Sequence, residues 1–162
     1  MTLALAYPDA NVPAISNTLS GSATTGNAQN SLSNIIDYTI ALQKVNAREA
    51  LSRVRSWGDD WDGAGSLAPS GKAQLKAQVF IEDAFRLTNE TNYAWKFPNI
   101  SANESGAYVL EWWRGTKKLT IYVDSNGFEF VKVWGVNIFD EMDDGVIESD
   151  EGFKELWAWL ST

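Results

Sequence analysis

The sequence predicts an α+β fold: an antiparallel meander of three to four strands packed against two or three helices, with a C-terminal helix. Two observations lead to this prediction. Apolar residues recur with a helical period of about 3.6 between residues 31 and 90, and again after residue 150. Between residues 107 and 134 the period changes to two, which is typical of strands with one covered face. Helices that precede and follow such a sheet form a two-layer sandwich.

The helices are expected in three places. The first spans 31–58, either as one continuous helix or with a bend near Asn46, where a second capping signal occurs. The second spans 71–90, and the hydroxyl of Ser70 is placed to cap it. The third spans about 150–160, where apolar residues follow an acidic first turn.

The strands are expected over 107–114, 117–124 and 128–134. The Ser-Asn-Gly sequence at 125–127 predicts a hairpin turn between the last two, because Asn and Gly tolerate positive φ. A short stretch around Ile100 is a candidate fourth strand at the edge. Apolar residues on both faces of the 128–134 strand indicate that the N-terminal arm or a partner covers part of the second face.

The domain organisation follows from length and composition. The 162 residues are enough for a single α+β domain, which we expect over 31–162. Residues 1–30 are rich in small and polar types, and Asp9 is their only charge. We therefore expect 1–30 to be a flexible or loosely docked arm.

The composition excludes most common catalytic chemistry. The chain has no cysteine and no histidine, which removes disulfides, thiolate nucleophiles, imidazole ligands and the Ser-His-Asp triad. We therefore expect a protein that is not an enzyme and needs no cofactor. No apolar run is long enough to span a membrane, and the start lacks the basic region of a signal peptide, which predicts a cytoplasmic protein.

The charge is uneven. The net charge is −8, and residues 136–162 carry eight acidic residues against one lysine, a local net charge of −7. Such a balance disfavours direct nucleic-acid binding and favours a basic protein partner. The candidate partner-binding residues are Asp140, Glu141, Asp143 and Asp144, followed by Asp59, Asp60 and Asp62 in a Gly-rich loop.

Two other hypotheses use the same carboxylates. Residues 140–151 match half of the EF-hand pattern, with Asp140, Asp144 and Glu151 at ligand positions but Met142 where an oxygen ligand belongs. This alternative is a small-ligand or calcium-binding module, against the simpler interpretation of a solvated acidic loop. The other alternative is a carboxylate-dependent hydrolase, for which acidic side chains on neighbouring strands, such as Glu111 and Glu129, supply the required pair.

Two motifs in the sequence resemble those of other proteins. The loop from Trp61 to Ser70 reads W-D-G-x-G-x-x-x-P-S and leads into a helix, and I-S-x-x-x-x-G-x-x-x-L-E-W runs from Ile100 to Trp112. Over about 50–135 the chain resembles a loosely defined group of uncharacterised bacterial and phage proteins, in which the loop typically reads W-D-G-Y-G-A. The resemblance implies a phage or mobile-element context, and that group has no established activity or site residues to carry over.

The leading hypothesis combines these observations. We expect a non-catalytic interaction protein that presents an acidic surface to a basic protein. An inhibitor of a defence system or an antitoxin-like neutraliser would act in this way, because acidic charge speeds association and aromatic anchors supply affinity.

Overall fold

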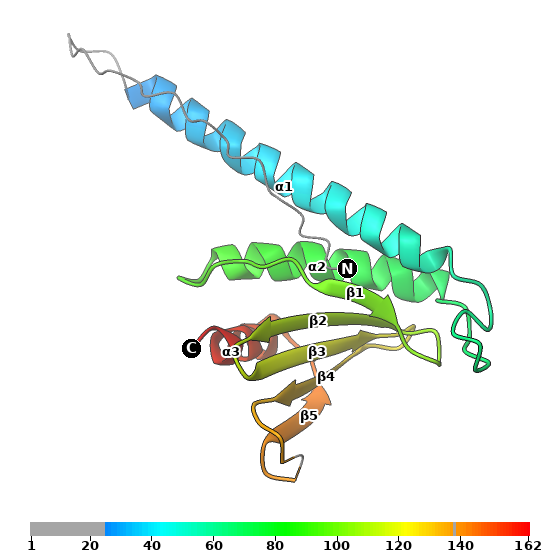
Figure 1. Ribbon diagram of the computed structural model, residues 1–162. Coiled ribbons are helices and arrows are strands. Elements are labelled where there is room, and N and C mark those ends of the chain that lie inside the picture. The colour runs from blue at the N-terminus through cyan, green and yellow to red at the C-terminus, as the bar shows by residue number, and fades with distance from the viewer. Residues whose placement is uncertain (1–24, 138) are drawn as a thin grey trace, which may run out of the picture. The chain divides into compact units, whose positions relative to one another are not determined.

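The computed structural model describes residues 25–137 and 139–162 (Figure 1). The chain divides into two units, 1–35 and 36–162, and of the first only the start of one helix is described. The described part contains, in order, α1 (Thr25–Arg55), α2 (Gly71–Asn89), β1 (Asn99–Ala102), β2 (Tyr108–Arg114), β3 (Lys117–Val123), β4 (Phe128–Val133), β5 (Met142–Val146) and α3 (Asp150–Ser161).

The α+β prediction is confirmed, with one more strand than expected. The strands form a single antiparallel meander in the order β1-β2-β3-β4-β5. The edge strand near Ile100 is present as β1, but residues 142–146, which we predicted to be part of an acidic loop, form β5. The sequence of β5 is MDDGV, and Asp and Gly are depleted in strands, so its pairing with β4 decides its conformation.

The first helix is continuous, without a break near Asn46. It begins at Thr25 rather than at residue 31 and ends at Arg55.

The arm expected over 1–30 falls mainly on residues 1–24, which lie outside the described residues. Among the described residues, no helix is both long and apolar enough to cross a membrane.

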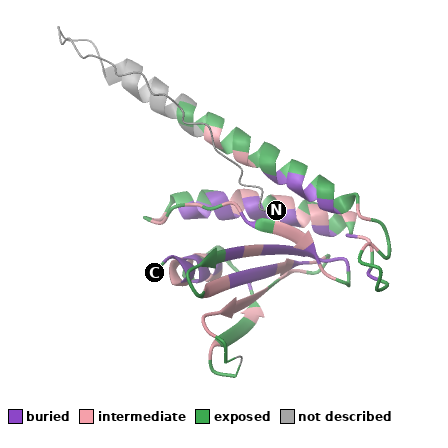
Figure 2. Ribbon diagram, viewed as in Figure 1, coloured by how far each residue is buried: buried purple, intermediate pink, exposed green. Residues whose placement is uncertain are grey.

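The hydrophobic core lies between the helices and one face of the sheet (Figure 2). Tyr108, Leu110 and Trp112 of β2 alternate toward this side and are essentially inaccessible to solvent. The hydroxyl of Tyr108 donates a hydrogen bond to the Leu51 carbonyl of α1 at 3.2 Å, and the ring of Trp112 lies 5.8 Å from that of Trp157 in α3. Each fully buried large side chain stabilises the fold by roughly 1.5–3 kcal/mol.

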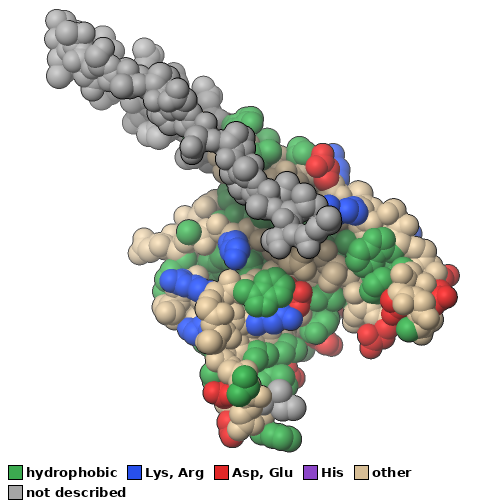
Figure 3. Space-filling model, in the orientation of Figure 1, with side chains coloured by type: hydrophobic (Ala, Val, Ile, Leu, Met, Phe, Trp, Pro, Cys, Tyr) green, Lys and Arg blue, Asp and Glu red, His purple; other side chains and the backbone are tan. Residues whose placement is uncertain are grey.

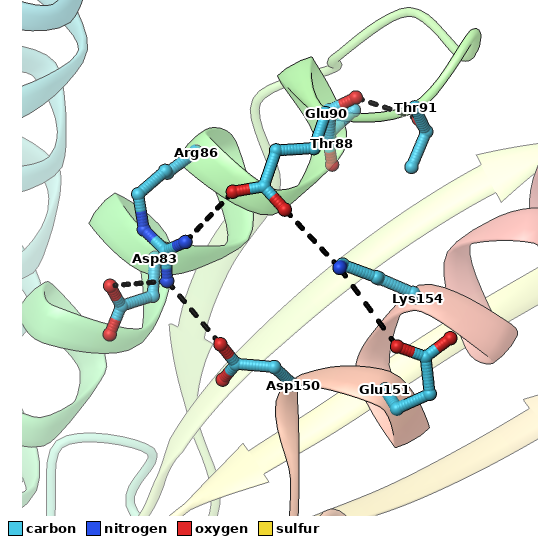
Figure 4. A network of polar contacts seen from close by, with 8 residues as sticks. All are labelled: Asp83, Arg86, Thr88, Glu90, Thr91, Asp150, Glu151 and Lys154. Carbon is cyan, nitrogen blue, oxygen red and sulfur yellow. Dashed lines mark hydrogen bonds and ion pairs between the residues drawn. The ribbon is translucent and has the colours of Figure 1, made fainter.

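Ion pairs join α2 to α3 at the edge of this core (Figure 4). Arg86 contacts Asp150 at 3.4 Å, and Lys154 contacts Glu90 at 3.2 Å. These side chains are largely exposed, so each pair contributes at most about 1 kcal/mol. The buried rings of Phe80 in α2 and Phe153 in α3, whose centroids lie 5.5 Å apart, hold the two helices together beneath these pairs.

The opposite face of the sheet, here called the open face, has no helix on it in the described part of the chain. Alternation places Trp113, Tyr122, Val131 and Val133 there. Val131 and Val133 are half-buried, and Trp113 is 43% exposed. Val131 and Val133 thus form an apolar patch on the open face, while its cover by the N-terminal arm or a partner stays a prediction.

Candidate functional site

The hairpin between β4 and β5 holds the first group of predicted partner-binding residues. The amide of Trp134 donates to the carbonyl of Glu141 at 3.0 Å at the base of the turn. Within the turn, the Glu141 carboxylate accepts the Asn137 amide at 2.8 Å, and Asp140 accepts the Asn137 side chain at 2.7 Å. Asp140 and Glu141 therefore act in the local structure of the turn, while still contributing negative charge to it.

Asp143 and Asp144 are adjacent in sequence but lie on opposite faces of β5. Asp143 is paired in register with Lys132, and its carboxylate contacts the Lys132 ammonium at 2.8 Å. The hydrogen bond and charge of Lys132 lower the pKa of Asp143. Asp144 lies on the open face, is exposed, and has no ion pair within the described residues. Successive side chains of a strand point to opposite faces of the sheet, so Lys132 neutralises Asp143 but does not reach Asp144.

A second free carboxylate lies diagonally beside Asp144. Glu129 is exposed on the open face of β4, and no described cation pairs with it. The register places Glu129 opposite Val146 and Val131 opposite Asp144. We call the open-face residues of these two strands the β4–β5 surface: Glu129, Val131, Val133, Met142, Asp144 and Val146.

A shallow groove of about 360 Å³ runs along the β4–β5 surface. Tyr122 of β3 forms one side of it, and Met142 and Val146, 37% and 59% exposed, form the other. Sequence reasoning missed this surface as a unit because it treated residues 140–151 as a loop. The available signal was the alternation of Glu129, Val131 and Val133, which places all three on one face.

The second predicted group, in the loop between α1 and α2, serves that loop. Asp59 accepts the Ala68 amide at 2.8 Å, and Asp60 accepts the Gly65 amide at 2.7 Å. Asp62 accepts the Ser66 hydroxyl at 2.5 Å, and this bond, followed by the bond from the Ala64 amide, lowers its pKa.

This loop lies at the other end of the sheet from the β4–β5 turn. The amide of Leu67 donates to Glu104 at 2.9 Å and that of Ser70 donates to Gly106 at 3.2 Å, both in the turn between β1 and β2. The antiparallel register places that turn and the β4–β5 turn at opposite ends of their strands. The seven predicted residues therefore form two separate groups rather than one patch.

The alternative calcium ligands are not brought together. Asp140 lies in the hairpin turn, Asp144 lies on β5, and Glu151 lies in α3, where it contacts Lys154 at 3.9 Å. A strand through the middle of the 140–151 segment is incompatible with a twelve-residue calcium loop wrapped around an ion. No group of three or more acidic side chains suited to a metal ion occurs within residues 25–137 and 139–162.

The carboxylates considered for a hydrolase share the open face but lie two strands apart. Glu111 is on β2 and Glu129 on β4, with a two-residue offset in register. Strand spacing and rise place their Cα atoms about 12 Å apart. Glu111 also forms an ion pair with Lys118. Glycosidases hold two carboxyl groups about 5–9.5 Å apart around the substrate, whereas here Lys118 pairs with one of the two carboxylates.

The other half of the open face carries a lysine packed on a tryptophan ring, which sequence reasoning also missed. The ammonium of Lys118 lies 5.2 Å from the centroid of the exposed Trp113 ring, and Lys96 donates to the Trp113 carbonyl at 3.4 Å. Arg114 and Lys117 flank the β2–β3 turn, but they lie on the core side of the sheet with Trp112 and Leu119, and Lys117 donates to the Trp159 carbonyl of α3 at 2.8 Å. Figure 3 shows Lys and Arg side chains gathered at the ends of β2 and β3, whereas acidic side chains gather near β5. Because Glu111 pairs with Lys118 on this half of the open face, the unpaired carboxylates described above are confined to β4 and β5.

Comparison with known proteins adds no family to this description. No protein-family model, curated protein or solved structure matches the chain.

Proposed function

We propose that this chain is a non-catalytic, cytoplasmic interaction protein that binds a basic protein partner through its β4–β5 surface. One observation carries the proposal. Glu129 and Asp144 are exposed carboxylates with no ion-pair partner among the described residues, and they lie among aliphatic side chains that no described helix covers. Of the acidic residues 140–144 expected from the sequence to bind a partner, the proposal keeps Asp144, which lies at the centre of the β4–β5 surface.

The two kinds of side chain have different roles in binding. Burial of Met142, Val146 and the partly exposed Val131 would favour the complex by roughly 25 cal/mol for each Å² of apolar area removed from water. The free carboxylates would select a cationic partner and speed its approach, aided by the net charge of −8. Asp143 adds little to this selection because Lys132 already neutralises it.

Such a protein would act as an inhibitor. A small acidic domain that covers the cationic site of a nucleic-acid-processing protein blocks it without any chemistry of its own. The motif resemblance to uncharacterised bacterial and phage proteins favours an anti-defence or antitoxin-like setting for it.

The test is quantitative capture of partners from the native host, with identification by mass spectrometry. The wild-type chain is compared with the double variant Glu129→Gln/Asp144→Asn. The control is Asp37→Asn/Glu49→Gln, which removes the same charge from exposed positions of α1. We expect a basic protein to be captured stoichiometrically by the wild type and the control, and to be lost with the β4–β5 variant.

Salt dependence provides a second measurement. At about 0.5 M salt the Debye length falls to roughly 4 Å, so association with the captured protein should slow markedly. Equal capture by all three chains, or an association rate independent of salt, would refute the proposed function.

A further inference from the structure

The sheet has a free edge at β5. β5 is the last strand of the sheet, and no strand pairs with its outer edge in the part of the chain that the structure describes (Figure 1). The inference rests on the proposed function and specifies its binding mode. We propose that the basic partner adds an extended segment to the outer edge of β5 as a sixth strand.

The register determines which backbone groups are available. The bonds from Trp134 to Glu141 and from Ile147 to Phe128 identify hydrogen-bonded pairs at both ends of the β4–β5 ladder. In an antiparallel ladder such pairs alternate with pairs that direct their N–H and C=O groups outward. Met142, Asp144 and Val146 are the outward-directed residues of β5.

The side chains of these three residues lie on the open face, so edge and surface form one recognition unit. Asp144 lies between Met142 and Val146 along the strand, and the groove of about 360 Å³ runs beside them. An added strand would extend the sheet with the same alternation, which places every second side chain of the partner on the open face. Backbone bonds would supply affinity, and the side chains beside the groove would supply specificity.

The negative charge of Asp144 determines which kind of segment can pair with the edge of β5. In a second copy paired antiparallel about the centre of β5, Asp144 would lie opposite Asp144, and like charges directly opposite are destabilising. A segment with Lys or Arg opposite Asp144 replaces that repulsion with attraction. The matching occupant is therefore an extended segment of the partner with a central cation and an aliphatic side chain two residues away on each side.

The test uses a defined peptide, acetyl-Lys-Val-Thr-Lys-Thr-Val-Lys-amide, with the full chain. Its central lysine and both valines would lie opposite Asp144, Met142 and Val146. One control peptide replaces all three lysines with glutamate. A second carries N-methyl groups on the central lysine and both valines, which removes the backbone donors that would face β5 and keeps the charge.

Amide hydrogen exchange measured by NMR is the main readout. With the lysine peptide we expect exchange at Met142, Asp144 and Val146 to slow by about tenfold or more, because outward N–H groups become hydrogen-bonded. Neither control peptide should have this effect. If the N-methylated peptide binds as tightly as the parent, strand addition is wrong, although an acidic surface for a basic partner remains. If the lysine peptide fails to bind, strand addition is also wrong, and the capture experiment decides the proposed function separately.

Proline variants test the same edge from the side of the protein. Val146→Pro removes an outward N–H without changing charge, and proline is tolerated on edge strands where the N–H faces solvent. We expect peptide binding to be lost with Val146→Pro and retained with Val146→Ala. Met142→Pro, at the first residue of β5, provides a second variant if the first fails to fold. Unchanged binding by a folded proline variant would overturn the inference.

Discussion

Replacement of Thr88 by valine should stabilise the protein. Thr88 lies near the end of α2 and is 1% exposed, and its buried hydroxyl has no hydrogen-bond partner in the described part of the chain. Its neighbour Thr91 differs, because the Thr91 hydroxyl donates to the Thr88 carbonyl at 2.7 Å (Figure 4). The same hydroxyl also accepts from the Tyr93 amide at 3.2 Å.

The expected magnitude follows from the cost of burying an unpaired hydroxyl. Protein mutational data place that cost at about 1–3 kcal/mol. Valine has nearly the same shape and helix propensity as threonine, so Thr88→Val removes the cost without opening a cavity. We expect the free energy of unfolding to rise by about 1 kcal/mol, or about 3–4 °C in Tm for a folded unit of this size.

Thermal and urea unfolding followed by circular dichroism measure this change. Thr91→Val is the matched control, since the same substitution there deletes two hydrogen bonds and should lower stability by about 1–2 kcal/mol. A loss of stability in Thr88→Val as large as that in Thr91→Val would show that the Thr88 hydroxyl has a partner, and the reasoning would fail.

Three further predictions concern other parts of the fold. Burial raises the pKa of Tyr108 to about 12, so its stabilising contribution is complete below pH 10 and is lost as the pH rises toward 12; Tyr108→Phe should flatten the alkaline limb of a stability–pH curve. The hydrogen bond from Ser66 lowers the pKa of Asp62, so stability is lost as the pH falls through the folded-state value, and Asp62→Asn should reduce that acid dependence. At Gly106, φ is +77° and an added Cβ would lie 2.7 Å from the Ala68 carbonyl oxygen; Gly106→Ala should lower the unfolding free energy by about 2 kcal/mol or more, measured by urea titration.

Local patterns were sufficient to predict several elements. The Ser70 hydroxyl caps α2 as expected, accepting a bond from the Ala73 amide. The turn at 125–127 forms because the Asp124 carboxylate accepts the amides of Asn126 and Gly127. Both depend on residues within four positions of one another, so their cause is visible in the sequence.

The sequence did not predict β5 for a physical reason. Its residues have low strand propensity, and pairing with β4 overcomes that preference. Pairing of this kind depends on the position of another strand, which the composition of the segment itself does not encode.

The sequence by itself therefore determined the fold class and the excess of acidic residues toward the C-terminus. Only the tertiary structure decided which of those residues are free. Asp143 and Asp144 are the same residue type in adjacent positions, but the alternation of the strand places Asp143 beside Lys132 and Asp144 on the open face. Asp59, Asp60 and Asp62 are also acidic residues, but amides and a hydroxyl of their own loop donate hydrogen bonds to their carboxylates. The sequence gives the charge of each residue, whereas strand register and loop closure determine which groups pair with it.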